Sequence, residues 1–172
     1  VAAVSIFAFL IAPLTGAASR EPVRAKQGMV VSASPIASAA GVEILKRGGN
    51  AVDAAVAVGF ALAVTHPTAG NLGGGGFMVI HDAAAGAQYA IDYRETAPGR
   101  AHRDMYLDGN GDVVDGLSTN GHLGVAVPGT PAGLLLALET HGTLDRAAVM
   151  APAAGPSETL FKSATLLSSS RR

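Results

Sequence analysis

The chain has 172 residues, and 12 lysines and arginines against 13 aspartates and glutamates leave a formal net charge of −1. This balance excludes the bulk electrostatic attraction that nucleic-acid-binding proteins need, and the absence of cysteine excludes disulfides, thiolate metal sites and a cysteine nucleophile. Charged residues are 15% of the chain, against about 25% in ordinary soluble domains, so we expect no nucleic-acid partner and a surface that needs a covering protein partner.

The N-terminal segment has the pattern of a secretory signal peptide. Residues Val1 to Leu14 carry no charge and are almost wholly apolar, and the small residues at 15–19 suit a cleavage site after Ala18. The run is shorter than the roughly 20 apolar residues of a membrane helix. The sequence therefore predicts a signal peptide at 1–18, no stable membrane anchor, and a periplasmic or secreted protein.

A strand followed by a helix is predicted next. Residues 28–32 form a short apolar run, and Ser34 and Pro35 can cap and open a helix. Apolar residues then recur every four positions, as on the buried face of a helix: Ile36, Ala40 and Ile44. The glycines at 48–49 predict its end.

A second helix follows directly. Asn50 with Asp53 three residues later has the pattern of an N-terminal capping box. Residues 52–64 are apolar on nearly every side, so we expect this helix to be buried. His66 and Pro67 predict its end.

The glycine-rich tract at 70–76 runs into an apolar strand candidate at 77–80. A dinucleotide-binding motif starting from Gly73 and Gly75 would need a third glycine where Met78 lies, and no Lys-Ser or Lys-Thr follows as a phosphate loop requires. The tract also precedes a strand, so the helix N-terminus that binds pyrophosphate is missing. The sequence favours a tight turn with close backbone packing.

Arg94 is the candidate binding residue. Residues 88–94 alternate as a strand joined through a hairpin at 82–86, which places Asp92 and Arg94 on the face opposite the tyrosines. The paired donors of a guanidinium can bind a carboxylate. The alternative is that Arg94 pairs with its acidic neighbours Asp92 and Glu95, and the local sequence alone favours that alternative.

The remaining elements are less strongly indicated. Residues 108–112 have turn chemistry, and 123–127 predict a short strand. Thr130 as the cap residue and Pro131 in the first turn predict the start of a helix over 132–141, with Gly142 as its stop. From 147 to 172 alanine, proline and serine dominate, and we expect this tail to be divergent and poorly ordered.

Two kinds of catalytic centre are not supported. The five histidines are never three or four residues apart, so their spacing does not favour a metal site. The sequence holds no Gly-x-Ser-x-Gly, which excludes a nucleophile elbow. We expect no metal and no cofactor.

Several blocks in one order resemble the large subunit of bacterial gamma-glutamyltranspeptidases over about residues 22–145. The blocks are Gly-Met-Val-Val at 28–31, Gly-Gly-Asn-Ala-Val-Asp-Ala-Ala-Val-Ala at 48–57, Thr-His-Pro at 65–67, Gly-Asn-Leu-Gly-Gly-Gly-Gly-Phe-Met at 70–78, Asp-Tyr-Arg-Glu-Thr-Ala-Pro at 92–98, Arg-Asp-Met-Tyr at 103–106 and Pro-Gly-Thr-Pro-Ala-Gly at 128–133.

The resemblance implies an exported N-terminal-nucleophile hydrolase that cuts itself into a large and a small subunit. Its fold would be an αββα sandwich of the α/β class, incomplete in this chain, with residues 19–146 as the N-terminal portion of the large subunit. The implied enzyme transfers the gamma-glutamyl group of glutathione to water or amino acids through an acyl-enzyme. The implied partners are glutathione, other gamma-glutamyl compounds and the small subunit of the same precursor.

The resemblance also implies a role for Arg94, which would hold the alpha-carboxylate of the donor. The implied nucleophile is the threonine that begins the small subunit, in a Thr-Thr-His block that this sequence does not hold. Thr65 and His66 do not replace that block, because Pro67 follows and the pair closes a helix. We therefore expect no catalytic residue here and no turnover by this chain alone. The alternatives are a non-catalytic gene remnant and a fragment of a related cephalosporin (glutaryl) acylase.

Overall fold

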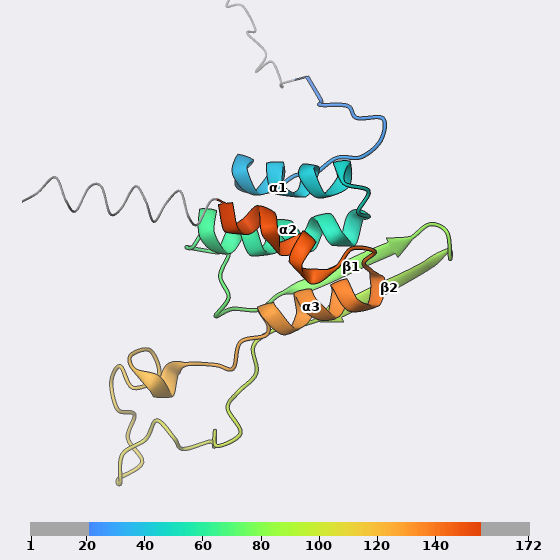
Figure 1. The fold of residues 1–172 in the computed structure, drawn as a ribbon. Helices are drawn as coiled ribbons and strands as arrows, with labels where there is room; N and C mark the ends of the chain where they lie inside the picture. The colour runs from blue at the N-terminus through green and yellow to red at the C-terminus, as the bar shows by residue number, and fades with distance from the viewer. Residues whose placement is uncertain (1–20, 156–172) are drawn as a thin grey trace, which may run out of the picture.

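The computed structural model describes residues 21–155, and the predicted signal peptide lies outside them. The described part combines helices with a two-stranded antiparallel sheet, which confirms the α/β class (Figure 1). The elements are α1 (Pro35–Lys46), α2 (Ala51–Thr65), β1 (Phe77–Asp82), β2 (Ala87–Asp92), the 3-10 helix η2 (His122–Gly124) and α3 (Thr130–His141).

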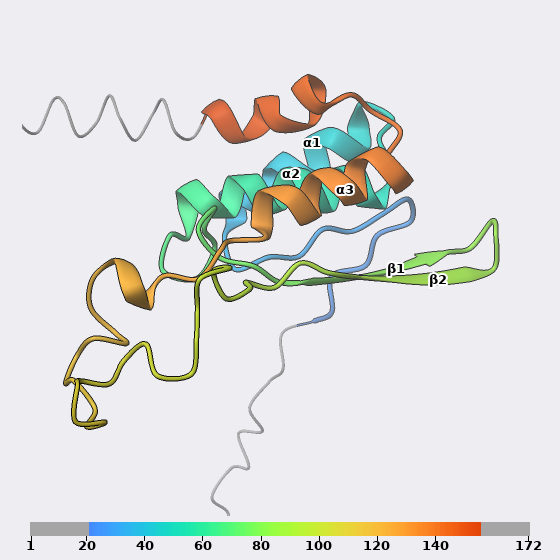
Figure 2. The ribbon, with the colours of Figure 1, turned by 90° about the horizontal axis from the view of Figure 1, so that it is seen from below.

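The helices form one layer and the hairpin lies beneath it (Figure 2). α2 packs against both α1 and α3, and α3 in turn contacts β2. The helix contacts are close because small residues line them: a Cβ added at Gly41 of α1 would lie 2.7 Å from Cγ2 of Val58 in α2. The long segment between β2 and α3 projects away from both layers in both views.

α1 has the predicted start and two of the three residues predicted for its buried face. The Ser34 side chain accepts a hydrogen bond from the Ala37 N–H, and Pro35 is in the first turn. Ile36, expected on the buried face, is 56% exposed. Ala40 and Ile44 are buried as predicted, and the buried face begins one residue later than expected, at Ala37.

The predicted strand at 28–32 is wrong. These residues have no strand assignment, and the described part of the chain pairs only β1 with β2. Val31 is 82% exposed. An apolar run becomes a strand only when another strand accepts its hydrogen bonds, and the described residues offer none at this place.

The capping box of α2 is confirmed. The Asn50 Oδ1 accepts from the N–H groups of Val52 and Asp53, at 2.8 and 3.0 Å, and Asp53 Oδ2 accepts from the Asn50 N–H at 2.7 Å. Asp53 is fully buried and also accepts from Thr143 and Leu144. One carboxylate therefore joins the start of α2 to the segment that follows α3.

The environment of Asp53 lowers its pKa. Burial opposes the charged form, but hydrogen bonds from the Thr143 hydroxyl and from the backbone of Asn50, Thr143 and Leu144 outweigh it. The pKa of Asp53 consequently lies below its ordinary value of 3.8. The carboxylate stays ionised inside the fold at neutral pH.

The hairpin is confirmed. Phe77 pairs with Asp92 at one end and Asp82 with Ala87 at the other. The alternation predicted over 88–94 holds for Ile91 and Tyr93, which are half-buried while Ala90, Asp92 and Arg94 are exposed, but Tyr89 is 40% exposed. In β1, Ile80 is buried toward the helices, whereas Val79 is 78% exposed. The tyrosine face of β2 turns toward α3, where the Tyr89 and His141 rings are 4.5 Å apart.

Two expectations near α3 are wrong. Residues 123–127 form no strand: η2 covers their start, and only the single bridge between Thr96 and Val127 remains. The cap residue of α3 is Gly129 rather than Thr130, and no side chain caps this end. The N–H groups of Gly129 and Thr130 donate to the Gly74 carbonyl instead.

The expected poor order after Arg146 is wrong for the residues that the structure describes there. Residues 146–155 are helical, and Val149 is fully buried. Alanine is a strong helix former and Val149 contributes to the core, which outweighs the weak periodicity. The rest of the tail, 156–172, lies outside the described residues. Over 21–155, no helix is long and apolar enough to cross a bilayer.

Candidate functional site

The candidate site lies where the hairpin meets the glycine tract and the start of α3. Tyr93 and Gly76 extend the hairpin by exchanging backbone hydrogen bonds, at 3.0 and 3.3 Å. The Gly74 carbonyl accepts from the N–H groups of Gly129 and Thr130, at 2.9 and 3.0 Å. Three segments that are distant in sequence therefore share one backbone network.

The glycine tract serves close backbone packing, as predicted. A Cβ added at Gly75 would lie 2.6 Å from the Tyr93 carbonyl oxygen and 2.8 Å from the Arg94 Cα. Real Cβ atoms essentially never come this close to backbone. The tract thus lets the backbone at Tyr93 and Arg94 pack directly against its own backbone, with no side chain between the two segments.

We expect Gly75→Ala to destabilise the fold by about 1 to 3 kcal/mol, the usual cost of forcing extra atoms into a packed site. Gly99→Ala is the matched control, because nothing lies within 4 Å of a Cβ added there. Urea unfolding of the chain followed by far-UV circular dichroism measures both. Equal midpoints for the two variants would contradict the packing role of the tract.

Arg94 is fixed at its backbone and loosely held at its side chain. Its N–H donates to Asp92 Oδ1 at 3.0 Å. The side chain is 66% exposed, with Nε 3.9 Å from Glu95 Oε2 and Cζ 5.9 Å from the centre of the Phe77 ring. Such an exposed, long ion pair contributes little. The Asp92 carboxylate is engaged with backbone, so neither acid locks the guanidinium.

Arg94 lines a groove of about 690 Å³. Arg94 is the one cation among its lining residues, and Glu95 the one anion. Most other side chains of the lining are apolar: Ala97, Pro98, Ala101, Met105, Leu123, Val125 and Ala126. Tyr106 also lines the groove and joins its two walls, since its hydroxyl donates to the Leu123 carbonyl at 3.1 Å. The arrangement suits a ligand that carries a carboxylate.

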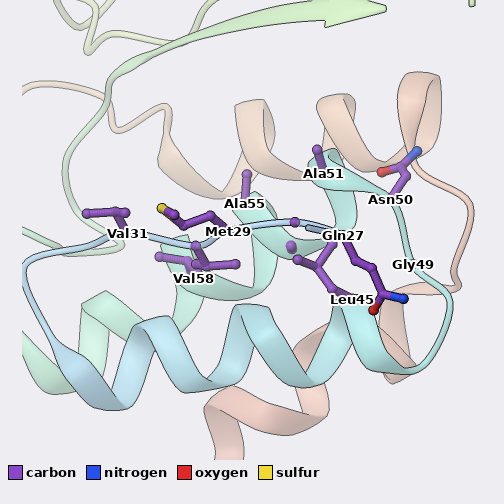
Figure 3. Close-up of a pocket in the computed structure, with 12 residues that line it drawn as sticks. Gln27, Met29, Val31, Leu45, Gly49, Asn50, Ala51, Ala55 and Val58 are labelled. Carbon is purple, nitrogen blue, oxygen red and sulfur yellow. The ribbon is translucent and has the colours of Figure 1, made fainter. Parts of the chain in front are cut away.

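A second cavity, of about 540 Å³, lies between the segment at 27–31 and the helices (Figure 3). Leu45, Ala55 and Val58 point into it, and none of its lining residues is charged. Asn50, at its edge, is already engaged in capping and in a 2.6 Å bond to the His141 carbonyl. The groove at Arg94 is therefore the better candidate for binding a charged ligand.

Arg94 lines the groove together with few other polar side chains, which are Glu95, Thr96 and Tyr106. The lining holds no histidine, serine or lysine. Across residues 21–155, no three acidic or histidine side chains are grouped to hold a metal ion. The groove therefore offers one cation for a ligand and no histidine, serine or lysine beside it.

Sequence reasoning missed Tyr93. The strand alternation placed its ring on the inner face, but only the structure shows that the ring meets α3 at Gly133. The glycines at 129 and 133 are four residues apart, which places them on one face of a helix start. The spacing of these two glycines and the alternation that places Tyr93 on the inner face are the signals that could have predicted the contact between Tyr93 and Gly133.

Comparison with known proteins gives consistent matches. The family described as gamma-glutamyltranspeptidase matches residues 37–159, past the point where a divergent tail was expected. A glutathione hydrolase proenzyme of Pseudomonas sp. (strain A14) is 56% identical over 137 residues, which are 80% of this chain and 24% of that protein. An acylase ACY 1 proenzyme of Pseudomonas sp. (strain V22) is 43% identical over 148 residues, 83% of this chain and 26% of that protein.

The crystal structure of the Helicobacter pylori gamma-glutamyltranspeptidase matches with a TM-score of 0.73 at 50% identity. The match covers 77% of this chain and 38% of that one. The chain spans about a quarter of the length of the curated relatives.

Proposed function

Because this chain belongs to the gamma-glutamyltranspeptidase family, we propose that it forms part of an enzyme that transfers the gamma-glutamyl group of glutathione to water or an amino acid. Arg94 binds the alpha-carboxylate of the donor. The observation that supports this role is an arginine that lines a groove, fixed at its backbone and without a close ion pair at its guanidinium.

The described residues orient the donor while another part of the precursor attacks it. Two parallel N–H bonds from Arg94 hold the carboxylate in one direction, which limits where the gamma-carbonyl can lie. A threonine at the start of the small subunit supplies the nucleophile, its own amine serving as base. The products are an acyl-enzyme and the released amine, and water or an amino acid then accepts the acyl group.

The proposed enzyme also has a defined fold and location. The described helical layer and hairpin are part of an αββα sandwich, and the small subunit supplies further layers. The segment at 1–18 directs export, so the enzyme acts in the periplasm or outside the cell. We expect no turnover by this chain alone, because its sequence does not hold the Thr-Thr-His block that carries the proposed nucleophile.

A glutaryl acylase is the second candidate, favoured by the 43% identity to an acylase proenzyme. A glutaryl amide has the same terminal carboxylate as a gamma-glutamyl amide and lacks only the amino group. Arg94 would fit either donor. The higher identity to the glutathione hydrolase proenzyme supports the gamma-glutamyl donor.

A chimeric proenzyme tests the proposal. It is the Pseudomonas sp. (strain A14) relative with its matching segment replaced by that of this chain. We expect the chimera to hydrolyse a gamma-glutamyl anilide faster than a glutaryl anilide, and the 172-residue chain to hydrolyse neither. Faster hydrolysis of the glutaryl anilide would show that the enzyme is a glutaryl acylase. A chimera that is correctly cleaved but hydrolyses neither anilide would favour a non-catalytic gene remnant.

A further inference from the structure

Tyr93, the residue before Arg94, lies in a notch formed by three glycines. A Cβ added at Gly133 would lie 2.1 Å from Tyr93 Cγ, and one at Gly129 would lie 2.0 Å from the Tyr93 carbonyl oxygen. On the other side, a Cβ at Gly75 would lie 2.6 Å from that same oxygen. Gly75, Gly129 and Gly133, here the glycine notch, admit Tyr93 only because none carries a side chain.

The notch holds Tyr93 through both its backbone and its ring. The backbone exchanges two hydrogen bonds with Gly76. The ring is partly buried and packs against the core, and this burial raises the pKa of the phenol. Tyr93 is therefore among the most constrained residues near the groove.

The side chain of Arg94, unlike that of Tyr93, is loosely held. Its side chain is 66% exposed, and its nearest acidic atom is 3.9 Å away. Consecutive residues of an extended strand point to opposite faces. Tyr93 accordingly faces Gly133 in α3 while Arg94 lines the groove. The side-chain contacts of Arg94 are too long to fix the guanidinium. The point from which it extends is set at the backbone, where the packing of Tyr93 adjoins the hydrogen bond from the Arg94 N–H to Asp92 Oδ1.

We propose that Tyr93, packed in the glycine notch, is the positioning residue for Arg94. This inference rests on the proposed function, in which Arg94 binds the donor carboxylate. Tyr93 does not contact the donor and acts only through the adjacent backbone. Since a displacement of about 1 Å at a binding group can cost about a hundredfold in rate, the notch determines how well the carboxylate is recognised.

The test compares two substrates in the chimera. One is a gamma-glutamyl anilide, and the other is a 4-aminobutyryl anilide, which lacks only the alpha-carboxylate. The ratio of their kcat/KM values measures carboxylate recognition, and it does not depend on the folded fraction because both substrates meet the same active molecules. We expect Tyr93→Ala and Gly133→Ala each to lower the ratio by about tenfold or more. The change should fall mainly on KM, because the carboxylate is bound in both the ground state and the transition state.

Two variants serve as controls. Tyr93→Phe keeps the ring in the notch and should keep the ratio. Tyr89→Ala removes the same side chain from the same face of β2, where Tyr89 contacts His141 rather than the notch. That variant should also keep the ratio.

The outcomes separate this inference from the proposed function. If Arg94→Ala leaves the ratio unchanged, the binding role of Arg94 is wrong. If Arg94→Ala lowers the ratio of the two kcat/KM values while Tyr93→Ala and Gly133→Ala leave that ratio unchanged, only the positioning role is overturned. Should Tyr93→Ala fail to fold, Tyr93→Leu retains apolar volume and is judged by the same ratio: a drop supports positioning, and no drop overturns it.

Discussion

Arg94→Ala in the chimeric proenzyme is expected to lower kcat/KM for a gamma-glutamyl anilide by about 30- to 5,000-fold. Arg94 is 66% exposed in the described residues, and in the proposed complete enzyme the small subunit covers the groove. The range corresponds to the roughly 2 to 5 kcal/mol lost when one partner of a hydrogen-bonded charge pair buried in this way is removed. The donor carboxylate would lie in the groove without a cation, since Arg94 is the one cation among the lining residues. Steady-state kinetics of the purified variant measures the effect.

Arg94→Lys and a second substrate make that experiment specific. Lysine keeps the charge but lacks the planar pair of donors, so we expect it to restore only a small part of the activity. Hydrolysis of the 4-aminobutyryl anilide should change little in either variant, because it has no carboxylate to bind. An equal loss on both substrates would show that the substitution damages the fold and that the binding role is unsupported.

Asp53→Asn is expected to destabilise the 172-residue chain by about 2 to 4 kcal/mol, because a single hydrogen bond to a charged group contributes about 1.5 to 3 kcal/mol and several are not additive. The fully buried Asp53 carboxylate accepts from Asn50, Thr143 and Leu144, and an amide cannot accept from all of these donors. Urea unfolding followed by far-UV circular dichroism gives the difference. Asp108→Asn is the control, because Asp108 also accepts several hydrogen bonds but is fully exposed, and its loss should be much smaller.

The pH dependence of the Asp53 effect has a fixed sign. The pKa of Asp53 is lower in the folded chain than its ordinary value of 3.8, so the unfolded chain takes up the proton first as the pH falls. The stability that Asp53 contributes is present above that ordinary value and is lost below it. The difference between wild type and Asp53→Asn should therefore be constant from neutral pH to about pH 5 and shrink below about pH 4. A difference that grew on acidification would contradict the ionised state.

Local signals predicted local structure well. The capping box of Asn50 and Asp53 needs only residues three apart, and the hairpin needs only its turn and alternation. The strands predicted at 28–32 and 123–127 did not form because a strand needs a partner, and pairing is decided far along the chain. The burial of Val149 is equally a property of tertiary packing.

The candidate site could be predicted only in part. Arg94 was identified from its chemistry and from the resemblance, whereas the local pattern favoured pairing with Asp92 and Glu95. In the structure the Asp92 carboxylate accepts a hydrogen bond from the backbone N–H of Arg94. The two-residue spacing is equally compatible with an ion pair between the two side chains, so the sequence could not distinguish them. The contact between Tyr93 and Gly133 joins residues forty positions apart, so it follows from the packing of α3 on the strand end.

The most direct test is a crystal structure of the chimeric enzyme with glutamate bound as the product of hydrolysis. We predict that two guanidinium nitrogens of Arg94 lie about 2.7 to 2.9 Å from the two alpha-carboxylate oxygens, with Tyr93 still in the glycine notch. A carboxylate bound by other residues, with the Arg94 guanidinium paired to Glu95 instead, would contradict the account.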